Sequence, residues 1–297
     1  MPVPLVENAP AKVNLTLRVL GRRDDGYHEI SSLVVFADFA DRLTLSPGDE
    51  LTLSVAGPRA AGAGSVADNL VLKAARALAA RLPGMVQGAI ALEKNLPAAA
   101  GIGGGSADAA ASLRLLARAN RLPATDPRVY DAARVTGADV PVCLDLQPRL
   151  MWGIGEKLSP PLALPRLAAV LVNPGVAVST KDVFANWTKK DRAATPLEPA
   201  AIAACKDSAS LVALLAGDGN DLEEPAVKLA PAIAEVLAAL RATQGCRLAR
   251  MSGSGATCFA IFDEDNAAQA AALSLTRQYP HWWTKACRLG AGAADPS

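Results

Sequence analysis

The residues best suited to do chemistry lie in a glycine-rich segment near the middle of the chain. Residues 96–106 read LPAAAGIGGGS, with four glycines within five positions, and an alanine-rich, helix-like run follows directly. A glycine-rich loop that leads into a helix lets several backbone N–H groups surround one anion at the helix's positive end. We therefore predict a phosphate-binding loop in which Ser106 caps the helix. The alternative is a flexible linker, which a position between a strand-like and a helix-like run does not favour.

Two better known phosphate loops fit this segment less well. A Walker A loop ends in Gly-Lys-Ser or Gly-Lys-Thr, whereas Gly104 is followed by Gly105 and Ser106, which excludes that class. A dinucleotide-binding G-x-G-x-x-G pattern that starts at Gly101 would end on Ser106. No convincing acidic residue follows about 20 residues later to hold a ribose. A Rossmann enzyme is therefore the less supported alternative.

An aspartate and a lysine far apart in the chain could activate a hydroxyl group. Asp139 lies in the tight sequence GADVP, although a carboxylate there could equally be a plain helix cap. Lys12 lies on the polar face of an alternating segment, residues 12–20, and Asn14 points the same way. An ammonium beside a carboxylate keeps it ionised and stabilises an alkoxide. With the phosphate loop, this pair would suit phosphoryl transfer to an alcohol if the three meet in space.

Two further loops carry groups that could bind a ligand. The turn Gly253-Ser254-Gly255 offers backbone donors that could close over the same phosphates or substrate, and its alternative is a simple hairpin turn. Tyr27 and His28 follow a glycine in a polar loop, which suggests stacking on a base and hydrogen bonding to a ring edge. A structural histidine is the alternative for His28.

Composition narrows the class of protein and of partner. The 297 residues, half of them apolar, suffice for one large or two ordinary domains. Thirty basic against 29 acidic residues favour a small-molecule partner over nucleic acid or a membrane. We find no signal peptide and no long apolar run, so we expect a cytoplasmic protein. Five scattered cysteines and two histidines suggest neither disulfides nor a transition-metal site, so the metal we expect is Mg²⁺ arriving with a nucleotide.

The chain reads as an α+β protein in two parts. Prolines at 160, 161 and 165 suggest a boundary that separates a domain of residues 1–160 from one of residues 161–297. Asp68 is expected to cap a helix in the first part. The second part reads as strand, turn, strand, helix and strand, which predicts a sandwich with helices on one sheet face. The predicted strands of the first part are residues 12–20, 31–36, 42–45, 51–55 and 88–93.

Three of these motifs resemble those of the GHMP small-molecule kinases: APAKVNL at residues 9–15, PAAAGIGGGSA at 97–107 and MSGSGAT at 251–257. The segments GRRDDGYHEI, GADVPVCL, GIGEKL and STKDVF further resemble the branch that phosphorylates a CDP-linked methylerythritol. The resemblance implies ATP-dependent phosphorylation of the 2-hydroxyl of that substrate, on the non-mevalonate route to isoprenoid precursors. Another alcohol such as mevalonate, homoserine or a sugar, or a non-catalytic nucleotide sensor, remains an alternative.

The resemblance also implies a fold and a role for individual residues. The fold would be the two-domain GHMP kinase fold, an N-terminal α/β domain with a left-handed crossover and a ferredoxin-like C-terminal α/β sandwich. The chain would be a monomer or a homodimer. Asp139 would be the base and Lys12 its electrostatic partner, with Asn14 positioning the substrate. Tyr27, His28 and Phe184 would bind cytosine. The substrate site would also include Thr180, Gly253, Ser254 and Gly255. The ATP site would comprise Asn69, Lys94, Pro97, Ala98, Ala99, Ala100, Gly101, Ile102, Gly103, Gly104, Gly105, Ser106 and Ala107, with Mg²⁺ accompanying ATP and no side chain assigned as a metal ligand.

Overall fold

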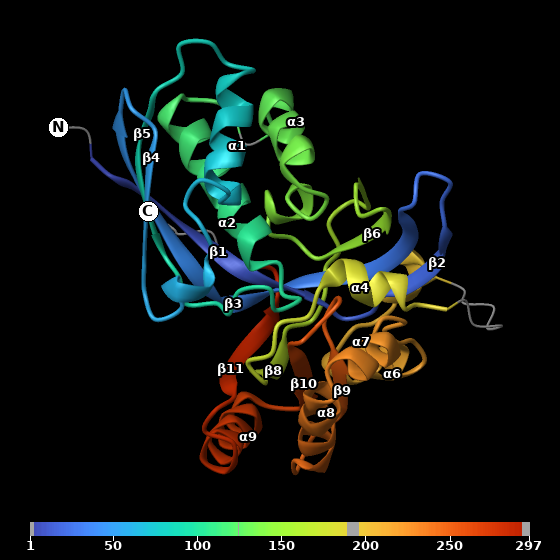
Figure 1. Cartoon of the computed structure of the whole chain (residues 1–297). Coiled ribbons are helices and arrows are strands. Elements are labelled where there is room, and N and C mark those ends of the chain that lie inside the picture. The colour runs from blue at the N-terminus through green and yellow to red at the C-terminus, as the bar shows by residue number, and fades with distance from the viewer. Residues whose placement is uncertain (1–2, 124, 189–195, 293–297) are drawn as a thin grey trace.

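A computed structural model describes residues 3–123, 125–188 and 196–292 of the chain. The strands in that part are connected into one mixed sheet, with helices packed against both halves of it (Figure 1). The α+β architecture predicted from the sequence is therefore confirmed. No helix in the described part is both long enough and apolar enough to cross a bilayer.

The sheet is organised around one long strand, β3. Its main path runs β4-β5-β3-β11-β8-β10-β9, while β1, β2 and β6 pair with β3 off that path. β3 covers two strands that we predicted separately, because β1 pairs with Ala40 and Asp41 and β11 pairs with Ala37, in the interval between them. The strands are β1 (Leu5–Asn14), β2 (Arg18–Arg22), β3 (His28–Gly48), β4 (Thr52–Ala56), β5 (Gln87–Glu93), β6 (Arg149–Gly153), β7 (Lys157–Leu158), β8 (Leu167–Asn173), β9 (Leu248–Met251), β10 (Cys258–Phe262) and β11 (Trp283–Gly290).

The helices form two groups, one for each half of the sheet. α1, α2 and α3 pack on one another, and α2 lies across β1 and β3 (Figure 1). In the C-terminal half, α8 packs against β9 and β10, and α9 packs against β8 and β11. The helices are α1 (Leu70–Ala79), α2 (Gly104–Ala119), α3 (Pro127–Thr136), α4 (Thr180–Ala185), α5 (Pro199–Ala203), α6 (Ser208–Ala216), α7 (Glu223–Leu229), α8 (Ala232–Ala242) and α9 (Asp265–Gln278), with 3₁₀ turns at Ala60–Gly62 and Pro141–Cys143.

Two helix starts differ from the predictions. Asn69, not Asp68, caps α1, because its side-chain oxygen accepts from the Val71 amide while Asp68 is bonded to Ser65. Likewise, the N-cap of α2 is Gly103, which leaves Ser106 inside the first turn. Gly103 has φ +62°, a conformation that glycine adopts at no steric cost. The prediction that Ser106 caps this helix was therefore wrong.

The alternating segment 12–20 is also divided in two. β1 ends at Asn14 and β2 begins at Arg18, because the amide of Leu17 donates to Gly219 O instead of to β3. The apolar face of the segment, with Val13 and Leu15, is buried as expected, but Lys12, Asn14 and Thr16 on the polar face are buried as well, so the strand is not half-exposed. Chain segments from the C-terminal half therefore reach into the N-terminal sheet at this point.

Three buried clusters make up the core. One lies among β3, β5 and helices α1 to α3, and a second lies among β8 to β10 and helices α7 to α9. The third joins side chains from both halves, such as Val13 and Ile102 with Leu171 and Phe259. The predicted division after residue 160 stays a prediction, because the sheet continues from β3 through β11 into the C-terminal strands.

Candidate active site

The predicted lysine and aspartate meet at the end of β1. Lys12 Nζ lies 3.1 Å from Asp139 Oδ2 and donates to Asn14 Oδ1 at 3.2 Å. The lysine side chain is 4% exposed, whereas that of Asp139, between α3 and the following 3₁₀ turn, is 42% exposed. A buried ammonium thus supports a carboxylate that is open to a ligand. The predicted shared face of Lys12 and Asn14 is confirmed by their contact.

The glycine loop packs directly against this pair. The amide of Lys12 donates to Ile102 O at 2.9 Å. A Cβ on Gly103 would lie only 3.1 Å from Cβ and Cε of Lys12, so the close approach of loop and lysine depends on glycine at this position. The loop, the N-terminus of the 16-residue helix α2 and the Lys12–Asp139 pair therefore share one region. This arrangement can hold a phosphate beside a group that accepts a proton.

Within residues 97–107 only part of the chain is available to a ligand. The side chains of Ala100, Ile102 and Ala107 are buried in the core. Ala98, Ala99 and Gly105 are exposed, and the remaining loop positions are half-buried. Buried side chains anchor the loop, so the groups it can offer to an anion are mainly backbone N–H groups.

The second glycine turn packs against the first glycine loop rather than standing alone as a hairpin. The amide of Thr257 donates to Ala100 O at 3.0 Å. Gly101 has φ +72°, and a Cβ there would lie 2.6 Å from the carbonyl oxygens of Ser252 and Gly255. In the same turn, Ser254 Oγ lies 2.8 Å from Thr180 Oγ1 at the start of α4. The turn therefore connects the loop region to α4.

Rings from two segments meet at the start of β3. His28 stacks on Phe184, with ring centroids 5.0 Å apart, and its ring also meets Trp187 edge-on at 5.6 Å. Burial and the nearby charge of Arg22 lower the pKa of His28, so its imidazole is neutral at neutral pH. Sequence reasoning missed Trp187. It lies three residues after Phe184, just beyond the end of α4, and this spacing was the available signal.

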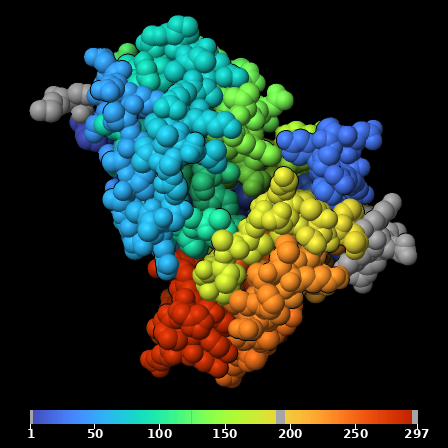
Figure 2. Space-filling model, in the orientation of Figure 1, coloured from blue at the N-terminus to red at the C-terminus, as the bar shows by residue number. Residues whose placement is uncertain are grey.

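Tyr27 is separate from these rings. It is 59% exposed and lines a groove of about 760 Å³ together with Lys73, Gly137, Ala138 and Ile154. The groove reaches the residues immediately before Asp139. Figure 2 shows the blue hairpin above the yellow segment that carries α4. The structure thus brings His28 and Phe184 together and leaves Tyr27 in the groove.

Lys94 and Asn69, expected near the nucleoside, have structural partners. Asn69 caps α1, and Lys94 forms buried ion pairs with Asp41 and with Asp108 Oδ2 at 2.7 Å. Asp41 Oδ1 also accepts the amides of Asn95 and Leu96, which fixes the start of the loop. Sequence reasoning missed both carboxylates, because Asp41 fell between the predicted strands 31–36 and 42–45, which the structure joins into β3.

The two carboxylates beside Lys94 differ. Asp108 Oδ1 is buried without a hydrogen-bond partner among the described residues. Burial raises the pKa of Asp108 well above its usual range, and Lys94 offsets only part of that effect. Burial also lowers the pKa of Lys94, but the charges of Asp108 and Asp41 outweigh it and raise that pKa overall. Across residues 3–123, 125–188 and 196–292, no three His, Cys, Asp or Glu side chains are grouped to hold a metal ion.

Comparison with known proteins agrees with this geometry. The model of the GHMP kinases N-terminal domain matches residues 69–145, and that of the GHMP kinases C-terminal domain matches residues 200–281. A 4-diphosphocytidyl-2-C-methyl-D-erythritol kinase of Rhodopseudomonas palustris is 58% identical over 294 residues, covering 96% of this chain and 97% of the relative. The kinase of the same name from Methylorubrum extorquens is 55% identical, covering 96% of this chain and 99% of the relative.

Solved structures show the same fold. A crystal structure of 4-(cytidine 5'-diphospho)-2C-methyl-D-erythritol kinase matches with a TM-score of 0.77 and 38% identity, over 97% of this chain and 100% of the other. The homoserine kinase from Cytophaga hutchinsonii matches with a TM-score of 0.73 at 18% identity, over 99% and 98% of the two chains, and thus supports the fold alone. The predicted GHMP kinase fold is confirmed. The chain belongs to the 4-diphosphocytidyl-2-C-methyl-D-erythritol kinases, a family within the GHMP kinases.

Proposed function

We propose that this chain is an ATP-dependent kinase that transfers the γ-phosphate to the 2-hydroxyl of 4-diphosphocytidyl-2-C-methyl-D-erythritol. The observation that carries the proposal is the 3.1 Å contact between Lys12 and Asp139 directly beside the glycine loop. Phosphoryl transfer depends mainly on positioning and charge stabilisation, and this region offers groups for both.

Asp139 and Lys12 have different roles toward the acceptor hydroxyl. The half-exposed carboxylate of Asp139 accepts the proton of the hydroxyl as it attacks. The ammonium of Lys12 keeps that carboxylate ionised and stabilises the developing alkoxide. Asn14 Oδ1 holds the ammonium from the other side, while Asn14 Nδ2 donates to Ser32 Oγ at 2.8 Å. The side-chain amide of Asn14 is therefore fixed in orientation and can position the substrate near the lysine.

The glycine loop and α2 hold ATP. Backbone N–H groups of residues 101–105 would donate to the phosphate oxygens, and the helix dipole adds positive potential at the same end. Mg²⁺ would come with ATP and be held mainly by phosphate oxygens, with Ser106, the hydroxyl in the first turn of α2, as the side chain suited to a hard cation. When bound, Mg²⁺ supplies charge neutralisation at the transferred phosphate.

The ring cluster supports recognition of the cytidine end. Phe184 and His28 offer flat faces to a base, and a neutral imidazole can donate and accept one hydrogen bond each. Thr180 and the turn at residues 253–255 lie between this cluster and the loop, where the chain linking cytidine to the acceptor hydroxyl would pass. Tyr27 would contribute from the groove side.

The test is a direct assay of the purified chain. With ATP, Mg²⁺ and 4-diphosphocytidyl-2-C-methyl-D-erythritol, we expect ADP and a product that carries one additional phosphate at the 2-position, identified by ³¹P NMR. CMP and CDP should compete with the cytidine substrate. Mevalonate and homoserine serve as control acceptors. Phosphorylation of a control acceptor without sensitivity to CMP would assign a different alcohol, and nucleotide binding without any transfer would indicate a sensor.

A further inference from the structure

We infer that the hydroxyl of Ser252 is a positioning group for the transfer step, which it serves by fixing the strand that carries Lys12 against the phosphate loop. The inference rests on the proposed function and deepens it. Ser252 directly precedes the second glycine turn, and its side chain is fully buried. It therefore acts through its neighbours and not on a substrate.

The hydroxyl joins two segments that are far apart in the sequence. Ser252 Oγ accepts a hydrogen bond from the backbone N–H of Asn14 at 3.0 Å and donates one to Gly101 O at 2.9 Å. Asn14 ends β1, two residues after Lys12, and Gly101 belongs to the glycine loop. One hydroxyl thus connects the acceptor side of the site with the ATP side.

This connection is the second of two fixed points between β1 and the loop. The first is the bond from the Lys12 amide to Ile102 O at 2.9 Å. A single hydrogen bond fixes a distance but allows one segment to tilt about the bond. The bridge through Ser252, two residues further along the strand, removes that freedom and so sets the direction in which Lys12 and Asn14 project.

The side-chain amide of Asn220 fixes the backbone on both sides of Ser252. Asn220 Nδ2 donates to the carbonyls of Met251 and Gly253, at 2.8 and 2.7 Å, which flank Ser252 on both sides. Asn220 Oδ1 accepts the amide of Leu222 at 2.9 Å, which fixes the orientation of the amide group. The position of the bridging hydroxyl is therefore fixed by these hydrogen bonds to its neighbours.

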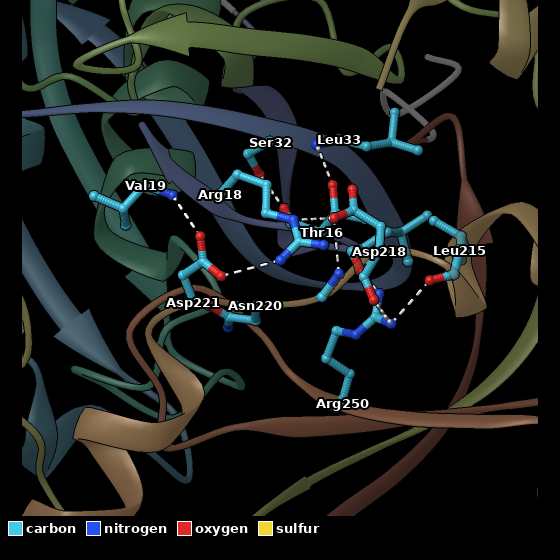
Figure 3. A network of polar contacts seen from close by, with 12 residues as sticks. Thr16, Arg18, Val19, Ser32, Leu33, Leu215, Asp218, Asn220, Asp221 and Arg250 are labelled. Carbon is cyan, nitrogen blue, oxygen red and sulfur yellow. Dashed lines mark hydrogen bonds and ion pairs between the residues drawn. The ribbon is translucent and has the colours of Figure 1, made fainter. Parts of the chain in front are cut away.

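The segment that carries Asn220 is also held against the chain that follows β1, where Figure 3 shows the carboxylate of Asp221 bonded to Arg18 and to the Val19 amide. Leu17 exchanges backbone hydrogen bonds with Gly219 and Asp221, at 2.9 and 2.8 Å. Arg18 forms an ion pair with Asp221 at 3.1 Å, and the buried guanidinium of Arg250 donates to Leu15 O at 2.7 Å. The contacts form a closed circuit from β1 through Ser252 and Asn220 back to the residues after β1.

Removal of the hydroxyl should therefore misalign the two sides without removing any group that touches a substrate. In-line transfer requires the attacking oxygen and the phosphorus in register, and a misplacement of about 1 Å can cost on the order of 10²-fold in rate. For Ser252→Ala we expect kcat to fall by about tenfold or more, with Kd for ATP and KM for the cytidine substrate within about twofold of the parent.

The experiment compares the parent, Ser252→Ala and the matched control Ser112→Ala. Ser112 is another fully buried serine, but among the described residues its hydroxyl bonds only to Ala109 O of its own helix, at 2.7 Å. Calorimetric titration with an ATP analogue counts the folded nucleotide sites, and kcat is expressed per site. A purely structural role would lower the number of sites and leave kcat per site unchanged. We expect Ser252→Ala to lower kcat per site and Ser112→Ala to keep it.

Ser252→Cys keeps the space filled but donates and accepts only weakly. Should the alanine variant fail to fold, this variant is expected to show the same selective loss of kcat per site. Parental kcat per site in whichever of these variants folds, or an equal loss in Ser112→Ala, would overturn the inference. An inactive parent would instead contradict the proposed function, so the two failures are distinguishable.

Discussion

The two proposed ends of the site, the transfer end around Lys12 and Asp139 and the recognition end around His28 and Tyr27, are built in different ways. At the transfer end, Lys12 and Asn14 are buried and hydrogen-bonded to segments more than 80 and 230 residues away. At the recognition end, His28 is held through ring contacts with α4, and Tyr27 is 59% exposed. Directional hydrogen bonds fix position and angle, whereas ring packing tolerates small shifts.

The difference matches the two tasks. Phosphoryl transfer requires reacting atoms in one geometry, so the groups that act on them benefit from being fixed before the substrate binds. Binding a base requires area and a few polar contacts, and the rings can adapt as the ligand enters. Changes at the transfer end should therefore alter kcat or ATP binding, and changes at the recognition end should alter the KM for the cytidine substrate alone.

The largest effect is expected for Asp139→Asn. The amide keeps the shape of the side chain but cannot take the proton, so kcat should fall by about 10²-fold or more while ATP still binds. The measurement is steady-state ADP release with a parallel titration of ATP binding. Asp49→Asn, at an exposed carboxylate after β3, is the control. Turnover close to the parental value would remove Asp139 from the mechanism and leave the transfer end without a base.

The next largest effect is expected for Gly101→Ala. Its Cβ would lie 2.6 Å from two backbone oxygens, at a φ of +72°. A strain of roughly 2 kcal/mol, if borne by the loop, weakens ATP binding about thirtyfold. Gly21→Ala is the control, because in the described part of the chain no heavy atom beyond its two sequence neighbours lies within 4 Å of its Cβ position. ATP binding equal to that of the control would mean that the loop is adaptable and would erase the contrast between the two ends.

The chemistry of the transfer end could be read from the sequence, but its assembly could not. Alternation put Lys12 and Asn14 on one face, and their side chains are in contact at 3.2 Å. Glycine density identified the loop, and the GADVP segment identified Asp139. That these segments meet, and that Ser252 bridges them, depends on contacts between residues 238 positions apart, which local patterns do not encode.

Burial of polar groups accounts for most of what the sequence did not predict. Asp41 fell between two predicted strands and Asp108 in a helix-like run, yet both contact Lys94 in the core. The two strands predicted within β3 are continuous for a similar reason, since pairing with β1 and β11 outweighs the polar residues between its apolar runs. In each case the structure depends on contacts with residues far away in the sequence, which local patterns do not reveal.

At the recognition end, His28→Ala should raise the KM for the cytidine substrate about tenfold and leave kcat nearly unchanged, because one ring contact and one hydrogen bond are lost. His281→Ala tests the other histidine of the chain as a control. A selective fall in kcat would place His28 at the transfer end and remove the contrast.

The pH dependence of the same KM tests the protonation state of His28. Because burial and Arg22 lower its pKa, the parental KM should stay constant from pH 8 to about pH 6.5 and rise only at lower pH, where protonation removes the acceptor nitrogen. His28→Gln, which does not titrate, should show no such rise. An inflection above pH 6.5 in the parent would contradict a half-buried, neutral imidazole.

The smallest effect is expected for Asp108→Asn, although Asp108 is more deeply buried than Asp139. Because its pKa is raised, the folded state keeps a proton that the unfolded chain releases, and the stability from Asp108 is lost as pH rises. The variant should match the parent near pH 4 and become more stable than it by on the order of 1 kcal/mol at pH 8. Urea unfolding at both pH values measures this.

The comparison variant is Asp41→Asn, which should destabilise the fold strongly at pH 8, because Asp41 accepts hydrogen bonds from Lys94 and from two backbone amides. A parent that gains stability over Asp108→Asn with rising pH would show that Asp108 is an ordinary ion-pair partner. The expected outcome instead means that burial beside the loop does not by itself make a carboxylate contribute to folding stability. The hydrogen bonds that the carboxylate accepts determine its contribution.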